Sequence, residues 1–333
     1  MINTIYVSLI RSSRRTGSLS LVFLLVFAAA IVLASCDSSG PATFGDPAEA
    51  PIVTSDIDRF WAAYDTSTPS NRAEVFQSEY LDKGSSGLDA FVDLRIDSAE
   101  KLAASVRAYE QYYLSTRPEM SRIAELEPEI RASFAALDTL YANATFPPVY
   151  FLVGRMSTGG TISNEGILIG AEMFSRPADA PLDELTEWHR AITGPVEDLP
   201  HIVAHELIHM QQRYGGETTL LHQSILEGCA DFLGEMISGR TVNQQVYDWA
   251  DPREAELWAE FQQEMNDTSL ENWLYQGNTG TDRPADLGYW MGYQIVEAYY
   301  QNAENKRQAV YDMLTVQDAA AFLEASGYAP PNP

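Results

Sequence analysis

Two histidines that lie four positions apart enclose a glutamate in the segment His205-Glu206-Leu207-Ile208-His209. Residues i and i+4 of an α-helix project from one face, so one cation can take an imidazole nitrogen from each histidine. The glutamate after the first histidine then lies beside the remaining coordination position, where a water binds. The pattern predicts a zinc site in which Glu206 is the general base for that water.

A third ligand is expected from Glu227, which follows His209 by 18 residues. Gly215-Gly216 separates two helical segments, so the second helix can pack antiparallel to the first. Three protein ligands and one water form the usual catalytic zinc site. Asp231, one turn beyond Glu227, is expected to accept a hydrogen bond from the outer nitrogen of His205.

Simpler interpretations compete with this site. The helix can be an ordinary amphipathic one with its polar residues in solvent, and Glu227 can be a surface acid. His201 precedes His205 by one turn and is an alternative ligand. Tyr289 or Tyr293 is a candidate donor to the oxyanion of a reaction intermediate, although aromatic core packing explains either residue as well.

The remaining histidines and the second cysteine are expected to be structural. His189 and His222 have no evident partner, and Cys229 is expected to be a small buried hydrophobe.

Hydrophobic periodicity predicts helices before and after a small sheet. Asp198-Leu199-Pro200 marks the start of the histidine helix, whose Val203, Leu207 and Met210 form the buried face. Helices are expected over residues 56–65, 98–115, 121–141, 182–192, 197–214, 218–237, 252–265 and 287–300, with two short ones near Gly327, and strands over 149–154 and 166–171. This order predicts an α+β, predominantly helical fold.

Four segments together carry a resemblance to a known family. The histidine motif with Glu227-x-x-x-Asp231 resembles the gluzincin zinc peptidases. More closely, the chain is similar over about 149–328 to a family of predicted zinc-dependent proteases among bacterial lipoproteins. The resemblance implies a zincin-like core with an active-site helix, and a strand over 166–171 that edges the cleft. The segments are Ile202 to His209, Leu226 to Phe232, Gly288 to Ile295 and Phe322 to Tyr328.

The first 35 residues are expected to be a lipoprotein signal peptide. Arg11, Arg14 and Arg15 precede an apolar run over 21–34, which is shorter than the ~20 residues of a spanning helix. The run ends at Leu33-Ala34-Ser35-Cys36, which resembles the bacterial lipobox and implies lipidation of Cys36. The alternative is an ordinary signal peptide with a chance cysteine. We expect a protein of the cell envelope, anchored to a bacterial membrane and facing the periplasm or the exterior.

The rest of the chain divides into three expected regions. Residues 36–55 form a lipidated tether, 56–146 a helical region and 147–333 the zincin-like catalytic region. With Cys36 lipidated, Cys229 has no partner for an intramolecular disulfide, so core burial must stabilise the exported chain.

These features predict a membrane-anchored metallohydrolase that uses Zn²⁺ and acts on a peptide or protein. One alternative is a non-catalytic envelope lipoprotein, similar to related gliding-motility lipoproteins, with a structural or vestigial metal site. A metal-scavenging lipoprotein is the other alternative.

The mature chain is strongly acidic. Without the signal peptide it has 18 basic and 47 acidic residues, a net charge of −29, and its three lysines are Lys83, Lys101 and Lys306. The sequence offers no basic patch for phosphates, so no nucleic-acid partner is expected. Such self-repulsion keeps a protein soluble in concentrated salt, and we hypothesise a salt-loving source over an acidic protein of ordinary habitat.

Molar salt should therefore raise both the stability and the activity of the protein, because it screens repulsion among the carboxylates. Urea unfolding in dilute and in molar potassium chloride measures the effect. A free energy of unfolding that does not rise with salt would contradict the halophilic hypothesis.

Overall fold

The computed structural model describes residues 43–241, 243–276 and 283–330. The predicted signal peptide and Cys36 lie outside these residues. The helices are α1 (Ser55–Thr66), α2 (Arg72–Val75), α3 (Ser86–Phe91), α4 (Ala99–Ala108), α5 (Glu110–Met120), α6 (Glu127–Leu140), α7 (Glu187–Ile192), α8 (Leu199–Gln211), α9 (Leu220–Ser238), α10 (Gln244–Ala250), α11 (Glu254–Glu264), α12 (Leu287–Asn302), α13 (Lys306–Leu314) and α14 (Ala319–Ser326). The strands are β1 (Ile52–Val53), β2 (Val149–Leu152), β3 (Gly160–Ile162) and β4 (Ile167–Gly170).

The four strands form one mixed sheet in the order β1-β2-β4-β3. β2 pairs in parallel with β1 and β4, whereas β3 pairs with β4 antiparallel. All residues of β2 and β4 are buried, as expected for strands covered on both faces. The predominantly helical α+β class is thus confirmed, and a zincin-like core stays a prediction.

The edge strand beside the motif helix differs from the prediction. β4, expected to edge the cleft, lies inside the sheet between β2 and β3. The edge is β3, which lies between the two expected strands, where the sequence predicted no strand. Three residues without hydrophobic alternation give too weak a signal for a strand, and pairing with β4 supplies the missing stabilisation.

The last part of the predicted tether is folded. Phe44 forms an antiparallel bridge with Phe146, and β1 joins the sheet edge opposite β3. Arg131 of α6 donates to the carbonyl oxygens of Pro47 and Ala48. These bonds, which join residues far apart in sequence, anchor residues 44–53 to the fold.

Several helix boundaries also differ from the expected ranges. The helix expected over 98–115 is two helices, α4 and α5, which meet at Tyr109 with non-helical backbone angles. The range 121–141 is a short 3₁₀ helix, Ile123–Leu126, followed by α6, which has Pro128 in its first turn. Among the described residues, no helix combines the length and the apolar character that crossing a bilayer requires.

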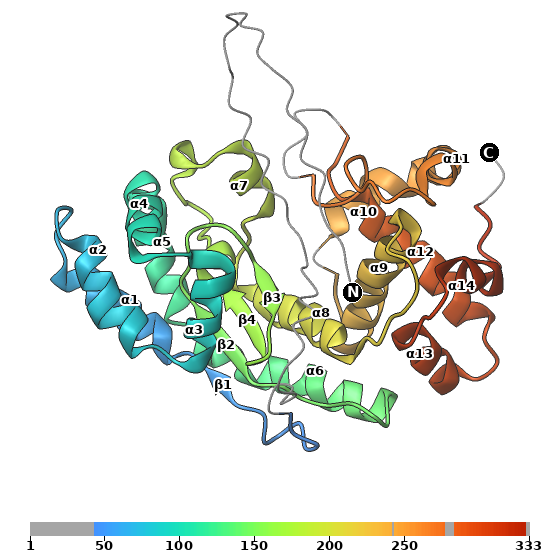
Figure 1. Cartoon of the computed structure of the whole chain (residues 1–333), viewed down its shortest axis with the longest axis horizontal. Helices are drawn as coiled ribbons and strands as arrows, with labels where there is room; N and C mark the ends of the chain where they lie inside the picture. Colours follow the sequence, from blue (N-terminus) through green and yellow to red (C-terminus); the bar gives the residue numbers. More distant parts are fainter. Residues whose placement is uncertain (1–42, 242, 277–282, 331–333) are drawn as a thin grey trace, which may run out of the picture. The chain divides into compact units, whose positions relative to one another are not determined.

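The motif helix α8 occupies the centre of the fold. α8 contacts β3 and β4 on one side and α9 on the other, and α12 packs along α9 (Figure 1). The helices α1 to α5 lie on the far side of the sheet from α9 and α12 (Figure 1). α8 is therefore held between a sheet edge and a helical layer.

The crossing of α9 and α12 depends on the close contact of Gly228 on α9 with Gly292 on α12. Gly288 and Gly292 are four positions apart on α12 and so share one face. A Cβ atom at Gly292 would overlap the Ser224 carbonyl group of α9, and one at Gly228 would overlap the backbone of Gly292. Only glycine permits this approach, which brings the backbones of α9 and α12 into direct contact.

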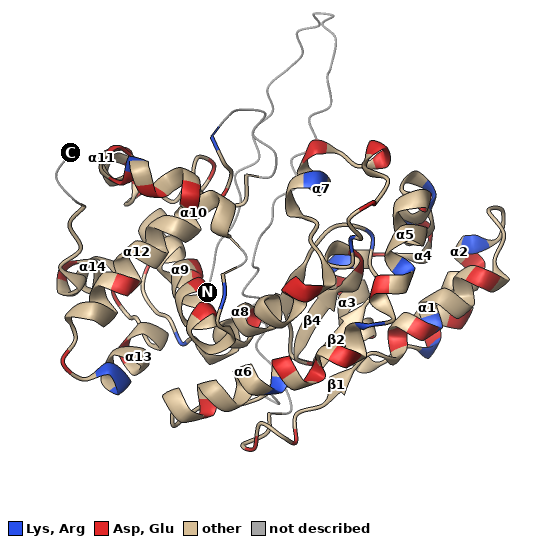
Figure 2. Cartoon of the chain, turned by 180° about the vertical axis from the view of Figure 1, so that it is seen from behind, with Lys and Arg blue, Asp and Glu red and all other residues tan. Residues whose placement is uncertain are grey.

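Acidic residues are distributed over the described part of the chain. Figure 2 shows Asp and Glu on many helices, including α1, α6, α7 and α11, with few Lys and Arg between them.

Replacing Gly292 with alanine should destabilise the protein by ~3 kcal/mol or more, because the new methyl group meets backbone that cannot rotate away. Thermal unfolding of Gly292→Ala measures the loss. Gly45→Ala is a suitable control, since a Cβ atom at Gly45 has no neighbour within 4 Å. Equal melting temperatures for the wild type and Gly292→Ala would refute the close helix contact.

Candidate metal centre

The motif helix begins as its sequence indicates but ends at Gln211, three residues before the expected end at 214. Pro200 lies in the first turn of α8, and Gln212 is its C-cap residue. Val203 and Leu207 are fully buried, so they orient the helix in the core. Its opposite face carries His205 and His209, which are about one-sixth and one-eighth exposed, at 16% and 13%.

The second helix brings Glu227 to the two histidines. α9 begins at Thr219, whose hydroxyl accepts the backbone N–H of His222, and ends at Gly239, whose φ is +86°. Nearly all of this helix is buried. Glu227 is 5% exposed and faces α8.

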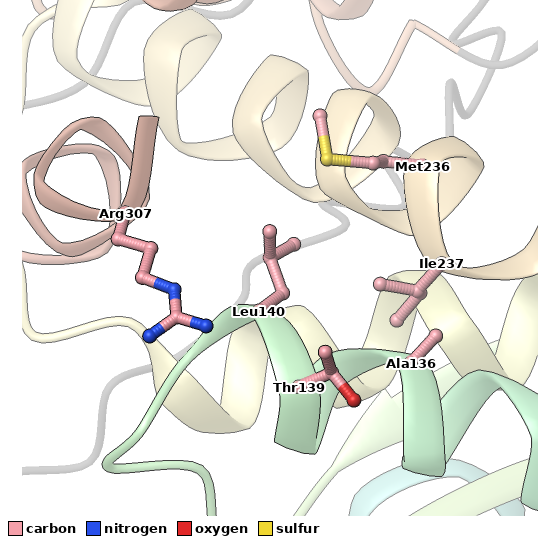
Figure 3. A pocket seen from close by; sticks show the side chains of 6 residues that line it. All are labelled: Ala136, Thr139, Leu140, Met236, Ile237 and Arg307. Carbon is pink, nitrogen blue, oxygen red and sulfur yellow. The ribbon is translucent and has the colours of Figure 1, made fainter. Parts of the chain in front are cut away.

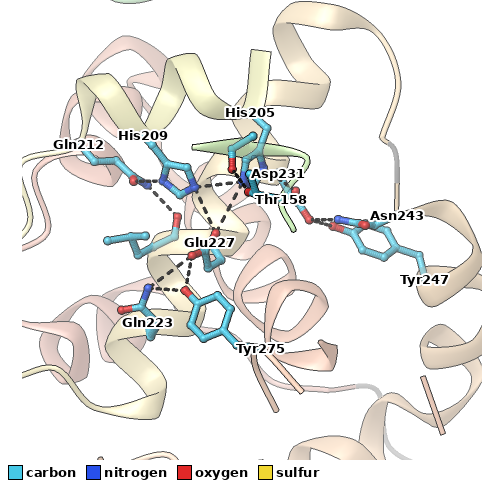
Figure 4. Close-up of polar contacts among 12 residues, drawn as sticks. Thr158, His205, His209, Gln212, Gln223, Glu227, Asp231, Asn243, Tyr247 and Tyr275 are labelled. Atoms are coloured by element: carbon cyan, nitrogen blue, oxygen red, sulfur yellow. Dashed lines mark hydrogen bonds and ion pairs between the residues drawn. The ribbon is translucent and has the colours of Figure 1, made fainter. Parts of the chain in front are cut away.

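Three atoms converge between the two helices, as Figure 4 shows. The Nε2 atoms of His205 and His209 are 3.0 Å apart. Oε2 of Glu227 lies 3.1 Å from Nε2 of His209 and 3.6 Å from Nε2 of His205. Ligands of a tetrahedral zinc ion, with bonds of ~2.0–2.1 Å, are separated by ~3.3 Å. The three atoms therefore have the spacing that this ion requires.

The hydrogen bonds of the two Nδ1 atoms indicate that, in the neutral histidines, each Nε2 atom has a free lone pair. His205 donates from Nδ1 to Asp231 Oδ1 at 2.8 Å, and His209 donates from Nδ1 to Gln212 Oε1 at 2.7 Å. Gln212 donates its amide N–H to the Leu226 carbonyl oxygen at 2.7 Å, which fixes its Oε1 toward His209. Each neutral imidazole has one proton, so the two Nε2 atoms face each other and Glu227 as acceptors. Such a cluster fits a cation.

Further polar residues hold Asp231 and Glu227. Asp231 Oδ2 accepts from Asn243 Nδ2 at 2.7 Å and from the Tyr247 hydroxyl at 3.0 Å. The Tyr275 hydroxyl donates to Glu227 Oε1 at 2.5 Å. Gln212, Asn243, Tyr247 and Tyr275 were not predicted from the sequence. Only Gln212 had a local signal, because it lies one turn after His209.

The opposite charges within the cluster shift the pKa values of its members. Burial would raise the pKa of Glu227, but the charge of His209 and the hydrogen bonds to both histidines hold it well below the usual range. Burial would lower the pKa of His205, but Asp231 and Glu227 raise it well above its usual value. These shifts favour protons on the two histidines when no metal is bound.

Glu206 lies against the edge strand. A Cβ atom at Gly160 of β3 would be 2.6 Å from Glu206 Oε1 and 2.9 Å from its Cγ, so the carboxylate occupies the space that glycine leaves. Burial raises the pKa of Glu206, although the charges of His209 and His205 act in the opposite direction.

The other predicted residues lie at different distances from the cluster. The Tyr289 ring stacks on His205, with centroids 6.1 Å apart. Tyr293 is directed elsewhere, because its hydroxyl donates to Glu235 at 2.9 Å. His201 bonds to Ser238 Oγ at 2.9 Å and is not part of the cluster.

The remaining histidines and Cys229 are packed in the fold. His189 bonds to the Met156 carbonyl oxygen at 3.0 Å, and His222 and Cys229 are buried.

An apolar hollow between α6, α9 and α13 shares no residue with the cluster. Its lining, in Figure 3, is Ala136, Thr139, Leu140, Met236, Ile237 and Arg307.

The family comparison matches residues 47–330, which is nearly all of the described chain, to the family Gliding motility protein GldB. The chain belongs to this family. Comparison with curated proteins and with solved structures gives no match. The predicted relation to gliding-motility lipoproteins is confirmed, whereas the relation to zinc peptidases stays a prediction.

Membership of this lipoprotein family indicates a lipid-anchored protein of the cell envelope. The anchoring residue predicted from the sequence, Cys36, lies outside the described residues. That the GldB-family chain faces the periplasm or the exterior stays a prediction.

The loop before β3 is fixed by a buried carboxylate. Glu172 is fully buried and accepts the backbone N–H groups of Gly154 at 2.9 Å and Met156 at 3.1 Å. Met156 has a φ of +60°, an uncommon angle for a non-glycine residue, which these contacts maintain. Burial raises the pKa of Glu172 from 4.5 to about 7.

Glu172 should make the fold less stable as the pH rises from 4.5 to about 7, because the folded chain holds this proton more tightly than the unfolded chain. The stabilisation that this proton gives the fold is complete below pH 4.5 and is lost as the pH rises through about 7. It amounts to ~3 kcal/mol at most. Glu172→Gln removes it. Urea unfolding of both proteins in chelator should show the stability difference shifting in favour of the variant with rising pH. A difference that does not depend on pH would contradict the buried proton.

Proposed function

We propose that this GldB-family lipoprotein is a zinc-dependent hydrolase of the cell envelope, and that it acts on polypeptides. Zinc would be held by His205, His209 and Glu227. The observation that carries the proposal is the convergence of three acceptor atoms, with the Glu206 carboxylate alongside them. Structural zinc sites are closed by four protein ligands, whereas catalytic sites have three. The cluster of described residues has three.

The bound ion would supply a Lewis acid that polarises a carbonyl group and lowers the pKa of water. Glu206 would take the proton from the attacking water and deliver it to the leaving amine. Gly160 would leave the space that this carboxylate needs, because a side chain at that position would collide with it. Tyr289, stacked on His205, is the candidate donor to the oxyanion.

The outer edge of β3, which pairs with no second strand among the described residues, supports a polypeptide substrate. Backbone bonds to β4 form at Gly159 and Ser163, so the alternation of an antiparallel pair directs the peptide groups of Gly160 and Ile162 away from β4. The Gly160 carbonyl oxygen accepts the Thr158 hydroxyl at 2.8 Å, so the groups offered to a peptide are the Gly160 N–H and the backbone groups of Ile162. An extended peptide can add to such an edge as a further strand. Since Gly160 also contacts Glu206, a peptide bound there would lie beside the proposed base. Ile162, at 39% exposed, offers it an apolar contact.

The second candidate function is a non-catalytic component of the gliding machinery, in which the cluster holds a metal for structural reasons. The family match favours this role directly. In its favour, Glu227 and the two histidines link α8 to α9, so a metal there would stabilise their packing. The presence of Glu206 distinguishes the two candidates, because a structural ion needs no base.

Replacing Glu206 with glutamine should abolish hydrolysis and preserve zinc binding, since the amide cannot take a proton. A loss of ~10²–10⁴-fold is expected for a general base. We would measure zinc per chain by elemental analysis and cleavage of an unfolded polypeptide such as casein, at low and molar salt. Glu165→Gln is the matched control, because Glu165 is an exposed glutamate of the β3–β4 turn.

The outcomes separate the candidates. Zinc binding with cleavage that Glu206→Gln abolishes supports the hydrolase. Zinc binding with equal cleavage by wild type and variant refutes the role of Glu206. Zinc binding without cleavage favours the non-catalytic component, and a chain that binds no zinc refutes both forms of the metal site.

A further inference from the structure

The two oxygens of Glu227 have different surroundings. Oε2 faces the histidines, 3.1 Å from Nε2 of His209. Oε1 is turned away from them and accepts the Tyr275 hydroxyl at 2.5 Å and the Gln223 amide at 3.4 Å (Figure 4). The carboxylate is therefore held by one oxygen and presents the other to the cluster.

The direction of these hydrogen bonds follows from their geometry. Gln223 donates its amide N–H to the Tyr275 oxygen at 2.7 Å. The phenolic hydrogen of Tyr275 is consequently free to point at Glu227, which as a carboxylate can only accept. Gln223 thus orients the tyrosine, and the tyrosine orients the glutamate.

The backbone at Tyr275 is held in an uncommon conformation. Its φ is +57°, and Asp286 has a φ of +62°. Next to Tyr275, the Gln276 N–H donates to Asp286 Oδ1, and the Asp286 N–H donates to Gln276 Oε1, each at 3.2 Å. Non-glycine residues with positive φ are strained and persist where surrounding contacts require them. Here the contacts fix the tyrosine that reaches Glu227.

We propose that Tyr275 is a positioning residue that restricts Glu227 to one-oxygen coordination of the metal. A carboxylate can bind an ion through one oxygen or through both, and the second oxygen takes a coordination position that water or substrate would otherwise use. By occupying Oε1, the hydroxyl of Tyr275 keeps that position open. The proposal rests on the proposed metal site and is independent of whether the site hydrolyses peptides.

The test replaces Tyr275 with phenylalanine, which removes one oxygen atom and keeps the ring. We expect zinc affinity to fall by about 10–100-fold, the usual effect of losing a partner of a metal ligand. With cobalt in place of zinc, we expect weaker visible absorption in the variant, because Glu227 can then add its second oxygen and raise the coordination number. A merely structural tyrosine would not change this spectrum.

Tyr299→Phe is the matched control, since the Tyr299 hydroxyl donates to a different acid, Asp312, at 2.8 Å. Should Tyr275→Phe not fold, Gln223→Met removes the donor that orients Tyr275 and should shift the cobalt spectrum in the same direction. If Tyr275→Phe has the zinc affinity and the cobalt spectrum of the wild type, the proposal is overturned. If Tyr275→Phe does not fold, the same result in Gln223→Met overturns it. So does a wild-type chain that binds no metal. A wild type that binds zinc without hydrolysis, together with a changed Tyr275→Phe spectrum, would support Tyr275 while refuting the hydrolase.

Discussion

The central constraint on this fold is the electrostatic repulsion among three hydrogen-bond acceptor atoms that lie close together between α8 and α9. The Nε2 atoms of His205 and His209 and Oε2 of Glu227 lie 3.0–3.6 Å apart, with both outer imidazole nitrogens bonded to acceptors. Acceptors at such distances repel each other unless a cation or a proton lies between them. A bound ion would turn this repulsion into attraction, and its binding energy would add to the stability of the fold.

Helix packing and a sheet edge hold those atoms together. The direct contact of Gly228 with Gly292 sets the approach of α9 to α12, and it lies one residue from Glu227. On the other side of α8, the buried Glu172 fixes the loop that leads into β3, where Gly160 meets Glu206. The positions of ligands and base thus depend on buried contacts that join segments far apart in sequence. In a GldB-family lipoprotein, this arrangement lies on a lipid-anchored chain of the cell envelope.

Local spacing was enough to predict part of the site. The i, i+4 geometry of His205 and His209, and the one-turn offset of Asp231 from Glu227, follow from helical periodicity alone. Tyr275 and Asn243 had no such signal, because they reach the site from loops whose course depends on tertiary packing. Strand β3 is too short to reveal itself by alternation, and the folding of residues 44–53 depends on partners about 80–100 positions away.

X-ray diffraction at the zinc absorption edge, on crystals of the protein grown with zinc, tests the metal centre most directly. We predict one anomalous peak between α8 and α9, bonded at about 2.0–2.2 Å to Nε2 of His205, Nε2 of His209 and one oxygen of Glu227. A peak at other residues, or the absence of any peak between these helices at saturating zinc, would contradict it.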